Sequence, residues 1–232
     1  TVNDILNNKL KGALEVLRYI IKRDGLMSIA SATVHALMRS EKSKIYPDLK
    51  VQIMLISGNN RYSRNKNHGM DPFPGFSLGV FPLYPTSRGT THIRSNYFRD
   101  NPVIKANYLS SQDDRNLTIK GLKLVRKIAT QKSISQYIVR EVRPGKNIED
   151  DEGLLNFARE TGQTSWHSIS TCRMGKGPDD VVNYDLKVHG IENLRIVDSS
   201  IMPCMPSSNT NAPSIVIGEK GADIVLNDLK YR

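Results

Sequence analysis

The sequence predicts an α+β fold, with strands and helices mixed along one chain. Residues 49–57 (LKVQIMLIS) alternate and then run apolar, which is typical of a β-strand. Residues 11–23 (KGALEVLRYIIKR) instead place their leucines and isoleucines at helical spacing. Patterns of both kinds follow one another without a regular βαβ alternation, so a mixed fold is favoured over a parallel sheet. The 232 residues leave room for one large domain or two small ones.

The first half of the sequence predicts one helix, three strands and two loops. The helix covers residues 11–23, and Gly25 lies just beyond its end, where glycine commonly caps a helix. Strands are expected at residues 49–57, 76–84 and 90–95. The loop at 58–76 is rich in Gly, Asn and Pro and is expected to be the most mobile segment, and residues 85–89 (PTSRG) form a tight turn.

The second half of the sequence predicts three helices and two short strands. The helices cover residues 117–130, 150–161 and 215–226, and the strands cover residues 165–171 and 194–197. Acidic residues open the helix at 150–161, where they stabilise the positive end of the helix dipole. Gly218 and Gly221 predict that the last helix packs closely against a neighbouring segment.

Composition places the chain among globular proteins. Hydrophobic residues make up 38% and charged residues 24%, with a mean hydropathy of −0.41, which is too apolar for a disordered chain and too polar for a membrane bundle. No run of about 18 apolar residues is present, so no transmembrane segment is predicted. The first residues (TVNDILNNKLKG) lack a signal-peptide pattern. We expect a soluble protein of undecided compartment, with the cytoplasm as the default.

The chain carries an excess of positive charge, which raises the question of a nucleic-acid partner. Lysine and arginine number 33 against 23 acidic residues, giving a net charge of +10. These basic residues are scattered, with one modest cluster at Arg61, Arg64 and Lys66. No basic-aromatic stripe or zinc-finger spacing accompanies them, so a solvated surface is favoured and no nucleic-acid partner is expected.

Two cysteines, Cys172 and Cys204, are too few for a disulfide framework or a zinc site. They either pair with each other or remain free and partly buried, and the second reading is favoured. No spacing of histidines matches a metal site, so no metal is predicted.

The last third of the sequence carries a series of short motifs in a fixed order. They are residues 166–175 (WHSISTCRMG), 181–183 (VVN), 186–190 (LKVHG), 193–203 (NLRIVDSSIMP) and 208–213 (SNTNAP). Their identity and spacing resemble the C-terminal signature of the glucose–methanol–choline (GMC) family of FAD-dependent oxidoreductases, and of its choline-dehydrogenase-like members in particular. The turn at 85–89 and the segments at 23–25 (RDG) and 46–49 (YPDL) fit the same family.

The resemblance implies a division into two functional parts. Residues 1–167 would form a substrate-binding domain with an antiparallel sheet and helices, and residues 168–232 would complete a Rossmann-like FAD-binding domain. The G-x-G-x-x-G fingerprint of that domain is absent, because the spacing that starts at Gly175 and Gly177 reaches Asp180 instead of a third glycine. The implied partner is therefore an N-terminal FAD-binding half, present either as a separate chain or as a missing segment.

The resemblance also assigns two catalytic residues. His167 matches the family's catalytic histidine, and Asn209 matches the second catalytic position. The implied reaction oxidises a small-molecule alcohol at its CH–OH group: His167 removes the hydroxyl proton, Asn209 positions the oxygen, and a hydride passes to flavin N5. Read without the family, His167 is a packed histidine and Asn209 belongs to an ordinary turn.

The same resemblance implies a set of cofactor contacts. Asp198 and Ser199 would lie beside the ribityl and pyrophosphate region of FAD, and Asp198 also fits a capping role. Backbone N–H groups would face the flavin pyrimidine edge. The expected FAD-binding residues are Trp166, Asp198, Ser199, Thr210, Asn211 and Ala212. His189 fits the family pattern as part of a structural turn.

Two other functions remain open at this point. The same scaffold serves flavin-containing lyases and decarboxylases that perform no net alcohol oxidation, because a fold does not fix a reaction. The chain also fits a non-catalytic fragment or binding module, although the presence of both His167 and Asn209 argues against that alternative.

Overall fold

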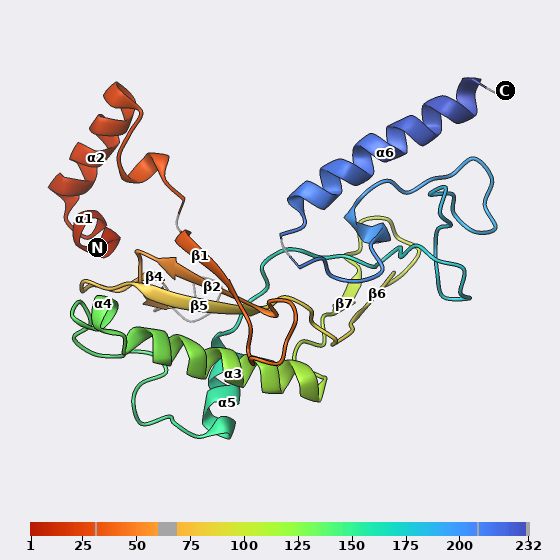
Figure 1. Ribbon diagram of the computed structural model, residues 1–232. Coiled ribbons are helices and arrows are strands. Elements are labelled where there is room, and N and C mark those ends of the chain that lie inside the picture. Colours follow the sequence, from red (N-terminus) through yellow and green to blue (C-terminus); the bar gives the residue numbers. More distant parts are fainter. Residues whose placement is uncertain (31, 60–68, 208, 231–232) are drawn as a thin grey trace. The chain divides into compact units, whose positions relative to one another are not determined.

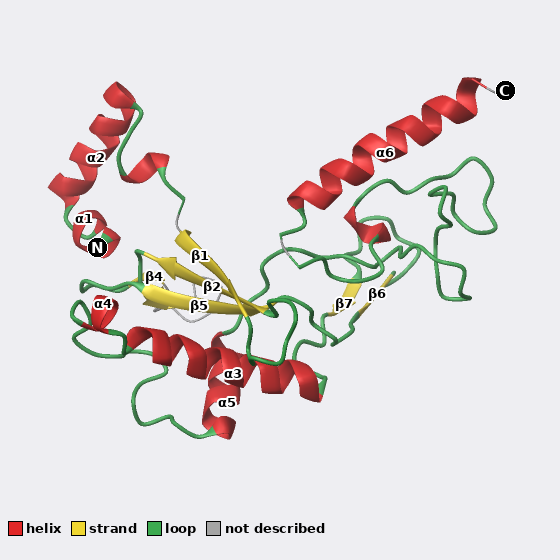
Figure 2. Ribbon diagram, viewed as in Figure 1, coloured by secondary structure: helices red, strands yellow, loops and turns green. Residues whose placement is uncertain are grey.

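A computed structural model describes residues 1–30, 32–59, 69–207 and 209–230, and the chain divides into two compact units (Figure 1). The first unit comprises Thr1–Pro82 and Arg115–Gln163, and the second comprises Leu83–Asp114 and Thr164–Arg232. Helices occur together with antiparallel strands (Figure 2), which confirms the predicted α+β class. These units assign residues 83–114 to the same body as the C-terminal segment. The functional boundary after residue 167 stays a prediction.

The first unit is built around a three-stranded antiparallel sheet in the order β1–β2–β5. Its strands are β1 (Ala32–Met38), β2 (Leu49–Met54) and β5 (Ser77–Pro82). In the central strand, Leu49 lies opposite Met38 on one side and Pro82 on the other. Leu49 and Val51 are buried and form the apolar face of the sheet. Two of these strands confirm the predictions at 49–57 and 76–84, with shorter bounds.

Two helices of the first unit pack below this sheet (Figure 1). They are α3 (Gln112–Ala129) and α5 (Asp151–Thr161), which confirm the helices predicted at 117–130 and 150–161. The α3 backbone approaches the sheet closely, because a Cβ atom on Gly121 would lie 2.7 Å from the Val80 side chain. Val125 of α3 and Leu154 of α5 are buried. The short helix α4 (Lys132–Ser135) follows α3.

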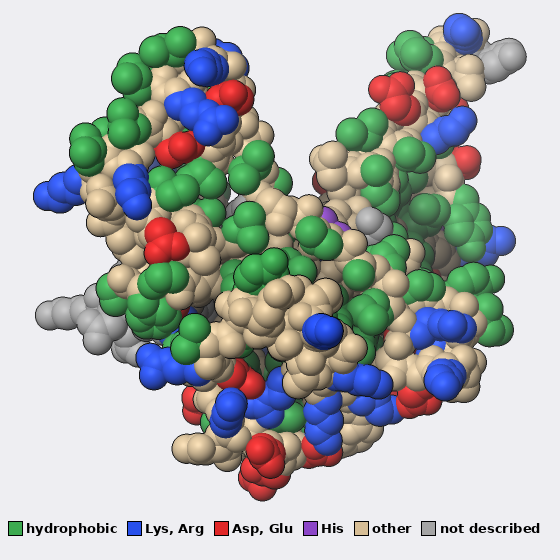
Figure 3. Space-filling model, turned by 60° about the vertical axis from the view of Figure 1, so that its left-hand side comes forward, with side chains coloured by type: hydrophobic (Ala, Val, Ile, Leu, Met, Phe, Trp, Pro, Cys, Tyr) green, Lys and Arg blue, Asp and Glu red, His purple; other side chains and the backbone are tan. Residues whose placement is uncertain are grey.

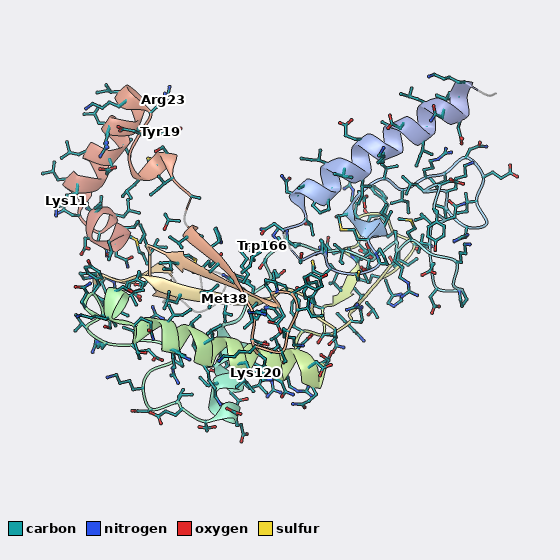
Figure 4. All side chains as sticks on the ribbon, viewed as in Figure 1. Lys11, Tyr19, Arg23, Met38, Lys120 and Trp166 are labelled. Atoms are coloured by element: carbon teal, nitrogen blue, oxygen red, sulfur yellow. The ribbon has the colours of Figure 1, made fainter. Side chains whose placement is uncertain are left out.

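Three short helical segments begin the chain: α1 (Val2–Leu6), α2 (Lys9–Lys22) and the 3₁₀ turn η1 (Leu26–Ser28). Asn8 caps α2 by accepting hydrogen bonds from two backbone N–H groups. The left-handed cap at the other end is Arg23 (φ 58°), whose guanidinium lies over the Tyr19 ring (Figure 4). The prediction that Gly25 caps this helix was therefore wrong, since the cap lies two residues earlier, at Arg23.

The side chain of Asn3 connects α1 to the end of the sheet. Asn3 is fully buried; its amide donates to the carbonyl oxygens of Ser57 and Asp71 (both 2.9 Å), and its carbonyl oxygen accepts from the Ser57 N–H (3.0 Å). Asp71 in turn pairs with the Arg143 guanidinium. The start of the chain is thereby held by polar contacts, whereas the apolar face of α2 stays at the surface (Figure 3).

The second unit begins with a turn and a two-stranded hairpin, β6 (Thr90–His92) and β7 (Val103–Lys105). The predicted strand at 90–95 is confirmed in its first three residues. The predicted turn at 85–89 is held by Asp114, whose carboxylate accepts from the backbone N–H groups of Thr86 and Ser87 (both 2.8 Å). Asp114 is buried, so this turn is attached to the start of α3 by a charged group shielded from water.

The core of the second unit is made by irregular backbone and not by a sheet. Val182, Leu186 and Ile201 are buried together, and partly buried Met, Val and Ile side chains surround them. The strands predicted at 165–171 and 194–197 were wrong. The first segment is irregular, and the second contributes one isolated bridge, between Arg195 and Lys187. Their apolar residues are partly buried or exposed, and Trp166 and Leu194 lie at the surface.

The second unit ends with the long helix α6 (Asn211–Lys230), preceded by the 3₁₀ turn η2 (Ser199–Ile201). The helix predicted at 215–226 is confirmed and is longer at both ends. A Cβ atom on Gly221 would lie 2.2 Å from the Val197 side chain, so close packing is confirmed there. At Gly218, no atom lies within 4 Å of such a Cβ, and the prediction of close packing was wrong.

Several other predictions fall on short or undescribed segments. The loop predicted at 58–76 contains a small hairpin, β3 (Gly58–Asn59) and β4 (Gly69–Met70), and its central residues 60–68 lie outside the described residues, as do Arg61, Arg64 and Lys66. Both cysteines are free; Cys172 is partly buried, whereas Cys204 is exposed, contrary to expectation. Across the described ranges, no helix has the length and apolar character to span a bilayer.

Candidate active site

The two predicted catalytic side chains meet in the second unit. The amide nitrogen of Asn209 lies 2.7 Å from His167 Nε2, although the two residues are 42 positions apart. His167 is partly buried and Asn209 is exposed, so the pair lies at the boundary between the protein interior and its surface. A neutral hydrogen-bond donor thus contacts the nitrogen of the imidazole that is most remote from the backbone.

Thr210 contacts the other nitrogen of the same ring. Its hydroxyl oxygen lies 2.9 Å from His167 Nδ1, and its backbone N–H lies 3.5 Å from the same atom. Thr210 is buried. The imidazole is therefore held from both sides by consecutive residues, and the hydroxyl contact is one that the sequence analysis missed. The adjacency of Thr210 to Asn209 is the signal that was present in the sequence.

Hydrogen bonds to backbone carbonyl oxygens align the segment after His167 with the segment before Asn209. The Ser170 hydroxyl donates to the Met202 carbonyl oxygen (2.6 Å). The N–H groups of Cys172 and Met174 donate to the carbonyl oxygens of Ser200 and Ile201, at 3.1 and 2.8 Å. These contacts bring two remote parts of the chain side by side without a sheet, and they define the positions from which both side chains project.

The residue before His167 has an unusual backbone. Trp166 has φ of 56°, in the left-handed region that a bulky residue rarely occupies. Its side chain is 57% exposed, so it is not a core residue of this unit (Figure 4). Strain of this kind persists only where surrounding contacts hold it, and such positions concentrate at functional sites.

The N-terminal end of α6 directly follows the histidine contacts. Thr210 precedes this helix, and its carbonyl oxygen accepts the first backbone bond from Ser214 N–H (3.0 Å). The N–H groups of Asn211 and Ala212 come before that first bond and have no partner within the helix. Together with the helix dipole, they favour an electron-rich group at this end. This donor set fits the flavin pyrimidine edge.

The remaining predicted cofactor residues lie on the 3₁₀ turn η2. Asp198 is exposed and caps the turn by accepting from the Ser200 N–H (2.7 Å), which is the capping geometry expected from the sequence. The Ser199 hydroxyl lies 3.4 Å from the carbonyl oxygen of Ser168, the residue that follows His167. The turn is thus attached to the segment that carries the imidazole, and the carboxylate of Asp198 remains accessible.

The other histidines have separate surroundings. His189 Nε2 lies 3.1 Å from the Gly175 carbonyl oxygen, within a turn. His35 lies on β1 and His92 on β6, whereas His68 lies outside the described residues. Within the part of the chain that the structure describes, no three His, Cys, Asp or Glu side chains are grouped so that they could hold a metal ion.

Comparison with known proteins identifies the family. Residues 85–218, more than half of the chain, match the family model described as GMC oxidoreductase. The chain belongs to the GMC oxidoreductase family. The matched range includes both His167 and Asn209, together with all the predicted cofactor contacts.

Curated GMC relatives are similar over most of this chain. An alcohol dehydrogenase [acceptor] of Pseudomonas putida is 33% identical over 216 residues, which are 93% of this chain and 38% of that protein. An oxygen-dependent choline dehydrogenase of Photobacterium profundum is 33% identical over 231 residues, which are 96% of this chain and 39% of that protein. The chain thus spans about two fifths of the length of these relatives.

Solved structures of GMC-like proteins have a similar fold. A pyridoxine 4-oxidase from Mesorbium loti matches with a TM-score of 0.74 and 26% identity over 84% of this chain and 38% of that chain. A fungal aryl-alcohol oxidase matches with a TM-score of 0.63 and 26% identity over 80% of this chain and 28% of that one. A formate oxidase at 20% identity shares the fold, with a TM-score of 0.84 over 98% of this chain and 44% of that one.

Proposed function

We propose that this chain is the substrate-facing part of an FAD-dependent oxidoreductase that oxidises the CH–OH group of a small-molecule alcohol. The observation that carries the proposal is the 2.7 Å contact between His167 and Asn209, which pairs a base with a neutral donor. In water, an imidazole titrates near neutral pH, so it accepts a proton readily under physiological conditions.

His167 is the proposed base. The alcohol O–H bond breaks, its proton passes to Nε2, and the ring becomes an imidazolium ion. FAD, when bound, supplies the hydride-accepting chemistry that completes the two-electron oxidation. In the structure, the Asn209 amide contacts Nε2. The incoming hydroxyl therefore displaces the amide and makes the hydrogen bond to Nε2 itself. The amide then donates to the alcohol oxygen and stabilises the negative charge that develops there.

The start of α6 is the proposed contact with the pyrimidine edge of FAD. The N–H groups of Asn211 and Ala212 are oriented by the helix, so they favour an electron-rich edge without any reorganisation. Asp198 and Ser199 would lie toward the ribityl and pyrophosphate region, and the exposed Trp166 beside the flavin. The other FAD contacts are assigned to an N-terminal half that lies outside this sequence.

The relatives support an alcohol as substrate. Four of the proteins named above are at least 26% identical to this chain. Their names are alcohol dehydrogenase, choline dehydrogenase, pyridoxine 4-oxidase and aryl-alcohol oxidase, and each acts on a compound with a hydroxyl group. A flavin-containing lyase or decarboxylase on the same scaffold remains the alternative reaction. Anaerobic addition of alcohol distinguishes the two, since an alcohol oxidoreductase bleaches its flavin absorbance whereas a lyase retains it.

Replacing the proposed base tests the role of His167. His167→Ala in the FAD-loaded protein should lower turnover by about 10²–10⁴, the range for losing one general acid–base group. Flavin content should be retained, because the backbone donors at the start of α6 are unchanged. Asn209→Ala should lower turnover by at most about 10²–10³, as for one lost oxyanion donor.

The matched control is His189→Ala, which removes an exposed histidine of the same unit whose Nε2 contacts the Gly175 carbonyl oxygen in a turn. Its turnover and pH profile should stay within about twofold of the parent, since surface changes of this kind are small. Parent activity should rise with pH as the proposed base loses its proton. If His167→Ala keeps near-normal turnover and the same rise, the base lies elsewhere and the proposal fails.

A further inference from the structure

We infer that the Thr210 hydroxyl is a positioning group that fixes the tautomer of His167. The inference rests on the proposed role of His167 as a base and adds the residue that makes Nε2 the basic nitrogen. The carrying observation is that both ring nitrogens have a side-chain contact, Nε2 with Asn209 at 2.7 Å and Nδ1 with Thr210 Oγ1 at 2.9 Å.

The chemistry of the two partners decides where the ring proton lies. The amide nitrogen of Asn209 only donates, so Nε2 must be the unprotonated nitrogen that accepts. A neutral imidazole has one acceptor nitrogen and one N–H group, so the proton lies on Nδ1. Nδ1–H then donates a hydrogen bond to the Thr210 hydroxyl oxygen. The Thr210 backbone N–H points to the same nitrogen at 3.5 Å, a length at which a hydrogen bond is weak. The shorter contacts determine the assignment.

Thr210 is well suited to hold this proton because it has little freedom. The residue is only 7% exposed. Its carbonyl oxygen accepts from both the N–H (3.0 Å) and the hydroxyl (2.6 Å) of Ser214, in the first turn of α6. As a β-branched residue it is restricted at χ1, so its hydroxyl stays directed toward the ring.

The contact remains favourable through the proton transfer. When Nε2 takes the hydroxyl proton of the alcohol, the imidazolium carries N–H groups on both nitrogens, and Nδ1–H still donates to Thr210 Oγ1. A hydrogen bond from a charged donor is about twice as strong as a neutral one, so the contact strengthens as the charge forms. Once the incoming alcohol displaces the Asn209 amide from Nε2, the Thr210 hydroxyl is the side-chain contact that still favours Nδ1–H. Without it, the displaced ring is free to hold its proton on Nε2, where it cannot act as a base.

The test is Thr210→Val in the FAD-loaded protein, a change that keeps the branched shape and removes the hydroxyl. The ¹⁵N shifts of labelled His167, identified by their loss in His167→Gln, report which nitrogen carries the proton. We expect Nδ1–H in the parent and an increased Nε2–H population in Thr210→Val. Turnover should fall by about 10- to 100-fold, the range measured when a metal-binding histidine loses the hydrogen-bonding partner that orients it.

Two further variants separate positioning from loss of structure. Thr210→Ser restores the hydroxyl and should restore Nδ1–H and most of the turnover. Ser214→Ala removes a hydroxyl that contacts the Thr210 carbonyl and not the ring, so it loosens the same helix start and should leave the tautomer on Nδ1.

The outcomes are distinct. An Nε2–H ring in the parent, or an Nδ1–H ring retained in Thr210→Val, overturns the inference. A tautomer that shifts in Thr210→Val without loss of turnover supports the Thr210 contact and overturns the base role of His167 instead. A loss of turnover in His167→Ala combined with an unchanged tautomer in Thr210→Val leaves the proposed function standing and rejects this inference alone.

Discussion

At the residue scale, the site depends on groups that satisfy more than one partner. Asp114 is an example outside the proposed chemistry, because its buried carboxylate holds the turn at 85–89 through two backbone N–H groups. Burial alone would raise the pKa of Asp114, but the hydrogen bonds from Ser87 and Thr86 outweigh burial and keep the pKa below its ordinary value. The charged form is therefore the one that stabilises the fold.

This shift gives a pH dependence with a definite sign. A carboxyl group with a lowered folded pKa stabilises the protein above its unfolded value, near pH 4, and that stability is lost as pH falls through the folded pKa. Asp114→Asn should lower the free energy of unfolding at neutral pH by about 1.5–3 kcal/mol, the contribution of a hydrogen bond to a charged group. The variant should also show a smaller loss of unfolding free energy as the pH falls below about 4.

Denaturant unfolding of the intact protein between pH 3 and pH 7 measures both effects. The control is Asp100→Asn, which changes an exposed aspartate whose carboxylate contacts the Ser95 hydroxyl (2.6 Å). The prediction fails if Asp114→Asn is as stable as the parent at pH 7 and loses stability at acidic pH in the same way. That result would show that water replaces the carboxylate without cost.

At the element scale, the sequence predicts the long helices and the strands β2 and β5, but it misses β1. The helices at 117–130 and 150–161 were recovered because their apolar spacing and acidic starts are local signals. Strand β1 was missed because most of its residues are exposed, so its sequence lacks the alternation of a half-buried strand, whereas the residues of the other edge strand, β5, are all partly buried. The segment at 165–171 was misread because its backbone is irregular, and no periodic sequence pattern identifies such a segment.

The site follows the same division. The resemblance supplied His167 and Asn209, and the pairing of their side chains is seen only in three dimensions, since 42 residues separate them. The Thr210 hydroxyl escaped prediction for the same reason. Its backbone was assigned to the cofactor from the motif, whereas its side-chain contact depends on where a remote histidine lies.

The glycines of α6 allow a matched test of helix packing. Gly221→Ala places a methyl group within 2.2 Å of Val197, so the helix must shift, at a cost of about 1–3 kcal/mol for overpacking. Gly218→Ala meets no atom within 4 Å and should gain about 0.5–1 kcal/mol, since alanine is favoured over glycine inside a helix. Thermal unfolding of the intact protein measures both, and equal shifts in the two variants would contradict this packing.

At the scale of the whole molecule, both units of this chain expose apolar side chains on their helices. Leucines and isoleucines along α2 are more than half exposed, as are Ile215, Val216, Leu226 and Leu229 on α6 (Figure 3). If residues 168–232 complete a Rossmann-like domain, as we propose, they cannot by themselves shield its apolar faces. The proposed N-terminal half would supply both this cover and the remaining cofactor contacts.

Expression of residues 1–232 alone tests this idea. We expect a protein that is poorly soluble or binds no FAD, because exposed apolar surfaces of this kind promote association. Co-expression with an N-terminal half from a GMC relative should restore solubility and the flavin absorbance. A soluble monomer that binds FAD without any other chain would contradict the requirement for a second half.

The hydrogen bonds between residues 170–174 and 200–202 also change the entropy of assembling the site. Joining His167 to Asn209 across 42 residues of unrestrained chain closes a long loop. Once Ser170 is fixed to Met202, only about ten residues of chain separate the pair, and two halvings of loop length reduce the closure cost by about 1.2 kcal/mol. The imidazole and the amide therefore meet as the ends of a short tether, before any ligand contributes to their alignment.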